Sequence, residues 1–216
     1  FVIDTQYDAI PSQVLTWAKL LLLDTVGNAY ASSRCEFAQI ALKALLGLDA
    51  GEGRVIGMPA KLTVRDAVLM NGILVHGLDF DDTYLPGAVH LTASVVPTAL
   101  ALAARSRASG KDMLAACVMG LEAGMRLAGA ANGGILRYGF HPTSVCGAFA
   151  SALAASKLMR LSHAHTVMAQ GLVLSSASGT MQPTQEGAWA KRMHPGLMGS
   201  AAITAAALAQ QGFTGS

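Results

Sequence analysis

Charged and aromatic residues are scarce in this 216-residue sequence, at 13% and 6% of the chain respectively. The formal net charge is only +2, and the Lys and Arg residues are scattered, with Arg105-Ser106-Arg107 and Lys191-Arg192 as the densest basic groups. A nucleic-acid-binding surface needs a concentrated basic face, often interleaved with aromatic side chains. We therefore expect no nucleic-acid partner.

Cysteine is scarce as well. The three cysteines, Cys35, Cys117 and Cys146, lie far apart in the sequence and form no C-x-x-C motif. This pattern provides neither a disulfide framework nor the ligand spacing of a zinc site. A reducing, cytoplasmic location is therefore expected.

Long hydrophobic runs are missing, although 52% of the residues are hydrophobic and the mean hydropathy is +0.44. The two longest apolar stretches, Val95 to Ala104 and Ala201 to Ala209, are shorter than the roughly 20 residues that a membrane-spanning helix needs. We expect no membrane partner and a tightly packed, Ala-rich interior. The sequence starts with Phe1-Val2, without an initiator Met or a signal peptide, and we interpret it as an excerpt from a longer protein.

A hydrophobic period of 3.6 residues is present along nearly the whole chain, and alternating strand patterns are not. It predicts an all-α fold, with one helical domain over residues 1–216. The motifs Thr63-x-x-Asp66 and Ser109-x-x-Asp112 are helix-starting capping boxes, Trp17 is expected in the core, and one short strand is expected at Arg54–Met58. The predicted helices run from Ser12 to about Tyr30, Phe37 to Leu46, Thr63 to about Leu78, Ser94 to Ala104, Ser109 to about Leu127, Pro142 to Arg160, Ser162 to about Ser175, and Pro195 to Gln210.

An acidic cluster stands out in this weakly charged chain, in the octet His76-Gly77-Leu78-Asp79-Phe80-Asp81-Asp82-Thr83. Clustered carboxylates repel each other and shift each other's pKa values, so they persist mainly where a cation or a proton transfer uses them. The octet can form a hydrogen-bonding, proton-relay wall or a Mg²⁺ site, since hard cations take oxygen ligands. His76 precedes Asp79 by three residues and could do no more than buffer its charge.

The members of the octet differ in their expected roles. If the preceding helix continues through the octet, Asp79 and Thr83 are at i and i+4 and share a face with Asp82, while Asp81 points elsewhere. We favour a functional role for Asp79 and Thr83 and a structural, backbone-capping role for Asp81. Asp82 fits either interpretation.

Two histidines each precede a proline, in His141-Pro142 and His194-Pro195. Both pairs suit a helix start, with His at the N-cap and Pro at the first helical position, where its missing N–H costs nothing. The positive end of a helix dipole attracts anions and disfavours imidazolium, which leaves such a His neutral and able to act as a base. The alternative is that each His only caps its helix. Two such pairs, each beside a Gly-rich loop, favour a site.

Five motifs together resemble the MmgE/PrpD family in order and approximate spacing, over most of the chain. The resemblance implies a helical domain, with the family's α/β lid domain absent from this sequence, and a homodimer. Members include 2-methylcitrate dehydratase, cis-aconitate decarboxylase and iminodisuccinate epimerase, so it also implies a metal-independent enzyme without a cofactor that acts on a small polycarboxylate. The motifs are Asn71-Gly72, the acidic octet, Gly139-Phe140-His141-Pro142-Thr143, Lys191-Arg192-Met193-His194-Pro195-Gly196 and Gly212-Phe213-Thr214-Gly215.

The resemblance also implies residue roles: a pocket wall, acid/base groups, a carboxylate anchor and further substrate contacts. The chain departs from the family at His90-Leu91-Thr92, where His-Pro-Ser is common, and at Leu197-Met198, where small or polar residues are expected. The resemblance places Asp79 and Thr83 in the pocket wall and gives His90 and His141 as acid/base groups. It makes Lys191 the carboxylate anchor, with Arg192 and His194 as the further substrate contacts.

The expected chemistry is proton transfer at a carbon next to a carboxylate. Lys191 and a helix N-terminus would hold substrate carboxylates while a neutral His moves the proton. Dehydration, decarboxylation and epimerisation all use such a step, and the segment 185–192 resembles the epimerase-like branch slightly more. Two alternatives remain open: a truncated, non-catalytic helical half that dimerises and binds anions, and a Mg²⁺-dependent all-α prenyl or terpene synthase, which would want a second acidic motif.

Overall fold

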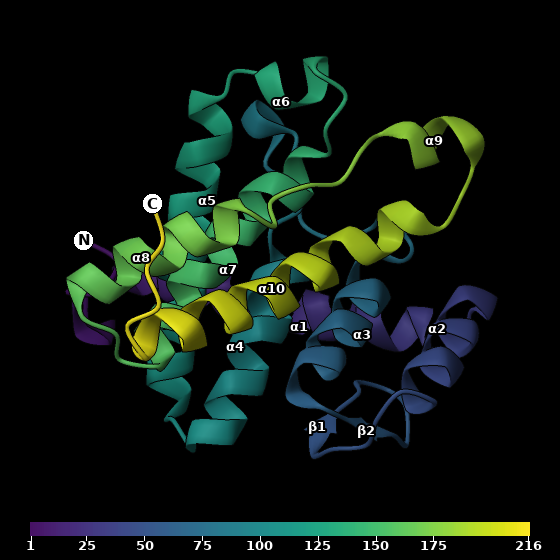
Figure 1. The fold of residues 1–216 in the computed structure, drawn as a ribbon, viewed down its shortest axis with the longest axis horizontal. Helices are drawn as coiled ribbons and strands as arrows, with labels where there is room; N and C mark the ends of the chain where they lie inside the picture. The colour runs from purple at the N-terminus through teal and green to yellow at the C-terminus, as the bar shows by residue number, and fades with distance from the viewer.

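The computed structural model describes all 216 residues, and the fold is all-α as predicted, with ten α-helices and a single two-stranded sheet (Figure 1). In chain order the elements are η1 (Tyr7–Ala9), α1 (Ser12–Ser32), α2 (Glu36–Leu46), β1 (Gly53–Arg54), β2 (Lys61–Leu62), α3 (Val64–His76), η2 (Leu85–Gly87), α4 (Thr92–Ser106), α5 (Gly110–Ala130), α6 (Gly134–Arg137), α7 (Pro142–Leu158), α8 (His163–Leu174), α9 (Gln182–Glu186) and α10 (Ala190–Gln210).

The centre of the fold is α7, which packs against α4, α5, α8 and α10. Thirteen of its 17 residues are buried, and nearly all of these are Ala, Ser, Thr, Gly or Cys. A helix that is covered on every side needs no polar face, and small side chains let four neighbours approach it closely. The Ala-rich composition therefore follows from close packing of helices around α7.

The closest approach between helices is at the crossing of α3 and α10, where Gly72 faces Gly196. A Cβ atom added to Gly72 would overlap the backbone of Gly196, and one added to Gly196 would overlap the carbonyl of Leu69. Only glycine fits at both positions, because backbone lies directly against backbone. The contact brings the C-terminal end of α3 next to the first turns of α10.

The two predicted capping motifs, at Thr63 and Ser109, do cap the starts of α3 and α5. Thr63 accepts a hydrogen bond from the N–H of Asp66 at 3.2 Å, and Ser109 and Asp112 form the reciprocal capping box of α5. The predicted strand at Arg54–Met58 lies slightly earlier, in β1, and pairs antiparallel with β2. At α1 the prediction was off by one position, since Ser12 is the first helical residue and makes no capping bond.

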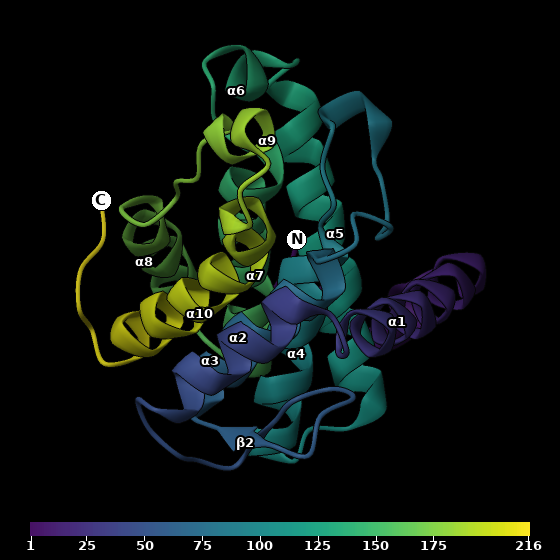
Figure 2. The same ribbon diagram turned by 90° about the vertical axis from the view of Figure 1, so that its right-hand side faces the viewer.

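The first helix corrects one prediction. Trp17, expected in the core, is 61% exposed, while Leu15 and Ala18 on the opposite side are buried. Figure 2 shows α1 projecting from the rest of the fold, so that only one stripe of it meets the body. Because α1 carries apolar residues all round, its sequence could not indicate which stripe is covered. Its outer face has no partner within this chain.

One helix, α5, has the length and apolar composition of a membrane span. More than half of its most apolar window is buried inside the fold, and α5 packs along α7. A core helix meets the same criteria, so the composition of α5 is weak evidence for a membrane. The predicted absence of a membrane partner stays a prediction.

Candidate active site

Polar side chains from four segments meet where the end of α3, the loop before α4, the start of α7 and the start of α10 come together. The loop after α8 closes this region, because the N–H of His141 donates to the carbonyl of Gly179 at 2.8 Å. Six of the seven predicted site residues lie here, together with two that were not expected to act. The eight residues are His76, Asp79, Asp81, Thr83, His90, His141, Lys191 and His194.

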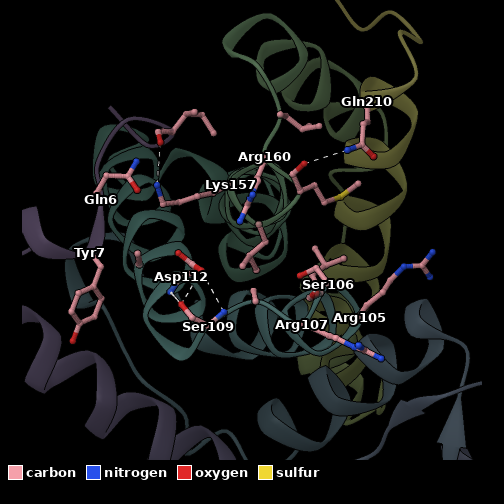
Figure 3. A pocket seen from close by; sticks show the side chains of 17 residues that line it. Gln6, Tyr7, Arg105, Ser106, Arg107, Ser109, Asp112, Lys157, Arg160 and Gln210 are labelled. Carbon is pink, nitrogen blue, oxygen red and sulfur yellow. Dashed lines mark hydrogen bonds between the residues drawn. The ribbon is translucent and has the colours of Figure 1, made fainter.

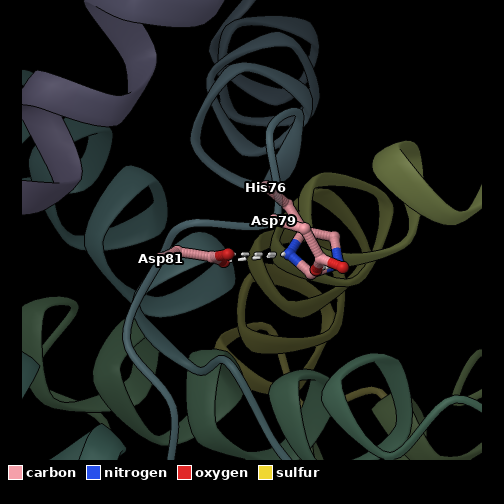
Figure 4. Close-up of side chains that lie close together, drawn as sticks. All are labelled: His76, Asp79 and Asp81. Atoms are coloured by element: carbon pink, nitrogen blue, oxygen red, sulfur yellow. Dashed lines mark hydrogen bonds and ion pairs between the residues drawn. The ribbon is translucent and has the colours of Figure 1, made fainter.

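Asp81 and His76 form a buried pair (Figure 4). The Nδ1 atom of His76 lies 2.9 Å from Oδ2 and 3.2 Å from Oδ1 of Asp81, and neither side chain is exposed. The helix ends at His76, and Asp79 then adopts a left-handed φ of 59°, which Asp tolerates better than most residues. This turn aims Asp81 back at the helix end. The predicted capping role of Asp81 was therefore wrong, and the condition under which Asp79, Asp82 and Thr83 would share one helix face, a helix continuing through the octet, is not met.

Asp82 has the structural role. Its Oδ1 accepts hydrogen bonds from the backbone N–H of Thr92, at 3.0 Å, and from the Thr92 hydroxyl, which anchors the first turn of α4. Burial raises the pKa of Asp82, and the bonds from Thr92 oppose that rise. Asp81 and Asp82 thus point to different partners and do not present adjacent carboxylates to one ligand.

Asp79 is bound to Lys191. The Lys191 ammonium lies 2.6 Å from Oδ1 of Asp79, and the Nε2 atom of His76 lies 3.8 Å from the same oxygen. Partial burial acts to raise the pKa of Asp79, but the hydrogen bond and charge of Lys191, helped by His76 and His90, hold it below its ordinary value. The residue predicted to anchor a substrate carboxylate therefore holds a carboxylate of the protein itself.

Four histidine rings form a chain in the order His90, His76, His141, His194. The ring centroids are 5.3, 5.5 and 5.3 Å apart along this order, and the Nδ1 atoms of His141 and His194 are 3.2 Å apart. Burial, with the positive charges of His76 and Lys191, lowers the pKa of His141 to about 2, and the same causes lower the pKa of His194. Both rings are neutral near pH 7, so one donates its Nδ1 proton to the other.

His141 and His194 differ in their place on the helices. His141 is the N-cap of α7 with Pro142 at the first position, as predicted, although its side chain makes no capping bond. His194 is not an N-cap, because α10 begins at Ala190 and Pro195 lies inside it. A proline near a helix start removes one backbone hydrogen bond without stopping the helix, and this possibility was overlooked. The extra turn carries Lys191 and Arg192.

Thr83 and His90 lie at the outer edge of the site. The Thr83 hydroxyl is 3.4 Å from Nδ1 of His90, which is itself 3.7 Å from Asp81. The backbone N–H of His90 donates to the hydroxyl of Thr143 in the first turn of α7, at 3.1 Å. Thr143 thus holds the loop at His90 against the start of α7, a role the sequence did not reveal.

Arg192 is occupied by other contacts. Its Nε atom donates to the carbonyl of Gly77 at 2.8 Å, and its guanidinium lies over the ring of Phe37, 4.8 Å from the centroid. Trp189 contacts the same ring edge-on. Arg192 therefore ties α10 to the end of α3 and to α2, and its predicted contact with substrate stays a prediction.

The site has an accessible layer and a buried layer. Asp79 is 58% exposed, His90 19% and Lys191 18%, whereas His76 and Asp81 are fully covered. His141 and His194 are also buried. A ligand that approaches from solvent therefore meets Asp79, His90 and Lys191 first.

One group of ligand atoms has the geometry of a cation site. A ring nitrogen of His76 and one oxygen each from Asp79 and Asp81 lie within 4.8 Å of one another. Such a mixed nitrogen and oxygen set could hold a divalent cation. The ammonium of Lys191 already neutralises Asp79, however, and a cation bound there would have to tolerate its positive charge.

A cavity of about 860 Å³ lies apart from this chemistry, at the other end of α7 (Figure 3). Its walls include Arg105, Arg107 and Arg160. The ammonium of Lys157 donates to the carbonyls of Val2, Ile3 and Thr5 there, at 3.0, 3.1 and 2.6 Å. None of the predicted site residues lines this cavity, so it belongs to the packing of the N-terminal segment.

The fold and the site define an all-α domain that gathers histidines and carboxylates beside a lysine at its helix ends. The MmgE/PrpD N-terminal domain matches residues 1–216, and the chain belongs to this family. Cis-aconitate decarboxylase of Homo sapiens is 33% identical over 213 residues, which are 95% of this chain and 44% of that protein.

Fungal relatives give the same result. Cis-aconitate decarboxylase of Aspergillus terreus is 32% identical over 213 residues, covering 95% of this chain and 43% of that protein. The cis-aconitate decarboxylase-like protein oryM of Aspergillus oryzae is 32% identical over 215 residues, with 95% and 44% covered. The chain thus spans less than half the length of the curated relatives it matches, and the resemblance seen in the motifs is confirmed.

Proposed function

We propose that this chain is the helical part of a lyase or isomerase that moves a proton at a carbon next to a carboxylate of a small polycarboxylate. The observation that carries the proposal is the Lys191–Asp79 ion pair at the mouth of a buried, neutral histidine pair. It supplies a cation for substrate carboxylates, beside imidazoles that burial keeps uncharged. The three relatives favour decarboxylation over dehydration and epimerisation as the first reaction to test.

The accessible layer suits the steps of a decarboxylation. Lys191 would bind one substrate carboxylate, and the substrate would lose a second carboxylate as CO₂. The electron pair of the broken C–C bond stays on the substrate, which then takes a proton at carbon from a protein acid. His90 is the accessible histidine and the first candidate for that acid, with Thr83 beside it. His141 stays a candidate acid/base group behind this layer.

The activity test uses the complete protein with cis-aconitate, 2-methylcitrate and iminodisuccinate as separate substrates. Release of CO₂ would support decarboxylation, and turnover of either other substrate would assign the reaction to the other branches. Lys191→Ala should reduce turnover of the productive substrate on the order of 10²-fold or more. Absence of turnover with every small polycarboxylate would contradict the proposal.

A non-catalytic, anion-binding helical half is the second candidate, because the chain spans less than half of its relatives. It predicts that citrate binds weakly at Lys191 without any turnover, even in the complete protein. A citrate titration followed by the ring-proton resonances of the six histidines would locate the binding. Shifts confined to His163 and His165, far from the site, would contradict both candidates.

We also propose a homodimer in the cytoplasm. The outer face of α1 exposes Trp17 and Leu23, and α2 exposes Ile40. An apolar face of this kind favours self-association. Sedimentation of the complete protein tests the dimer. The double variant Trp17→Glu, Leu23→Glu should sediment with the mass of a monomer, and a wild type that is already monomeric would contradict the proposal.

A further inference from the structure

The Nε2 atom of His76 is a buried polar atom without a hydrogen-bond partner. The other ring nitrogen is bound to Asp81, which fixes the ring orientation and aims Nε2 at the accessible layer. Buried polar atoms are nearly always paired, so an unpaired one at the centre of a site calls for an explanation. Oδ1 of Asp79 lies 3.8 Å from it, which is too far for a hydrogen bond.

That oxygen of Asp79 is held by the Lys191 ammonium at 2.6 Å. Asp79 therefore lies between two nitrogen atoms and bonds only one of them. Its side chain is 58% exposed, so it has room to turn. A rotation that closes about 1 Å would exchange the lysine for His76, at an ordinary hydrogen-bond distance of about 2.8 Å.

We propose that His76 is a positioning residue that receives Asp79 when a substrate carboxylate takes its place on Lys191. The proposal rests on the proposed function, since it assigns Lys191 to a substrate carboxylate. In the exchange no covalent bond forms or breaks: Lys191 loses one carboxylate and gains another, and Nε2–H of His76 donates to Asp79. Asp81 stays on Nδ1 throughout.

The exchange has two consequences for the site. Asp79 is withdrawn from the lysine and gains a hydrogen bond from the buried ring, so the Nε2 atom of His76 no longer lacks a partner. The full charge of Lys191 then acts on the substrate.

Two substitutions distinguish the contributions of the two ring nitrogens of His76. His76→Asn keeps a donor near the Nδ1 position for Asp81 and leaves nothing at Nε2, whereas His76→Gln places an amide near Nε2. We expect His76→Asn to lower kcat on the order of 10²-fold with little change in KM. His76→Gln should recover part of kcat. An unchanged kcat in His76→Asn would overturn the proposal.

His163→Asn is the matched control, because His163 also pairs with an aspartate, Asp4, at 2.8 Å, but on the surface. It should leave kcat and KM unchanged. An equal loss in this variant would show that the effect of His76→Asn is not local, and would count against the proposal.

A second measurement needs no turnover and applies even if His76→Asn fails to fold. In the complete protein with ¹⁵N-labelled histidine, Lys191→Ala should free Asp79, so that the Nε2 resonance of His76 moves without any ligand. Citrate added to wild type should move it in the same direction. An Nε2 resonance that ignores Lys191→Ala overturns the exchange whatever the enzyme's reaction, whereas absent turnover with a responsive Nε2 overturns only the proposed function.

Discussion

Two aspartate–histidine pairs in this chain have nearly the same geometry and opposite surroundings. Asp81 and His76 lie 2.9 Å apart with both side chains fully covered, and Asp4 and His163 lie 2.8 Å apart with side chains 60% and 70% exposed. In the exposed pair, the hydrogen bond from His163 and then the N-terminal ammonium lower the pKa of Asp4. Water can replace either partner there, but nothing can replace Asp81. Distance alone therefore says little about what such a pair contributes.

The largest contrast should appear when each aspartate is removed. Asp81→Ala leaves a buried His76 with neither nitrogen paired, and we expect the free energy of unfolding to fall by about 3–5 kcal/mol, as for other broken buried pairs. Asp4→Ala should leave the urea midpoint unchanged, because water solvates His163. Urea denaturation of both variants measures this difference, and similar midpoints for the two would refute the comparison.

A smaller effect, on rate rather than stability, is expected at the accessible layer. Lys191→Ala should reduce turnover on the order of 10²-fold or more, equivalent to about 2.7 kcal/mol, through loss of charge stabilisation. The fold should persist, because Asp79 is more than half exposed and water can solvate it. Lys43→Ala, at an exposed position on α2, is the control and should match wild type in steady-state kinetics. Turnover within a few-fold of wild type in Lys191→Ala would remove the lysine from the site.

The next effect concerns pH and the buried histidines. Folded His141 has a pKa of about 2, while an unfolded histidine takes up a proton below about pH 6.5. Lowering the pH through 6.5 therefore favours the unfolded state, and stability should fall by about 1.4 kcal/mol per pH unit from this residue. His194 adds to the effect with the same sign. Urea unfolding between pH 5 and 7 measures the slope, which His141→Gln should reduce.

The smallest expected effect distinguishes a charge-paired site from a metal site. Exhaustive EDTA treatment should leave the turnover of the complete protein unchanged, and Mg²⁺ should not raise its melting temperature. The reason is that Lys191 already provides the positive charge that Asp79 needs. Loss of turnover on chelation with recovery on Mg²⁺ addition would instead assign His76, Asp79 and Asp81 to a cation.

Local signals predicted much of the fold from the sequence. The capping motif at Ser109 and the hydrophobic period located most helices to within a few residues, because caps and periods are properties of short segments. The meeting of Asp79 and Lys191 follows from the family motifs. The outward face of α1 could not be foreseen, since burial of Trp17 depends on which elements pack beside it.

The buried layer of the site escaped prediction for a related reason. The capping role predicted for Asp81 is wrong because the left-handed turn at Asp79 reverses the chain and directs the Asp81 carboxylate at His76. Only glycine has a strong sequence preference for that conformation, and Asp adopts it without a clear signal. The N-cap position predicted for His194 is wrong because Pro195 lies inside α10 and not at its start. Both errors concern single backbone turns that tertiary contacts decide.

The glycine contact between α3 and α10 limits how this domain can move. With no side chain between Gly72 and Gly196, sliding either helix along the other would drive a neighbouring side chain into the opposing backbone. The two helices therefore move together, and the end of α3 with His76 keeps its place beside Lys191 in the first turn of α10, where both face Asp79.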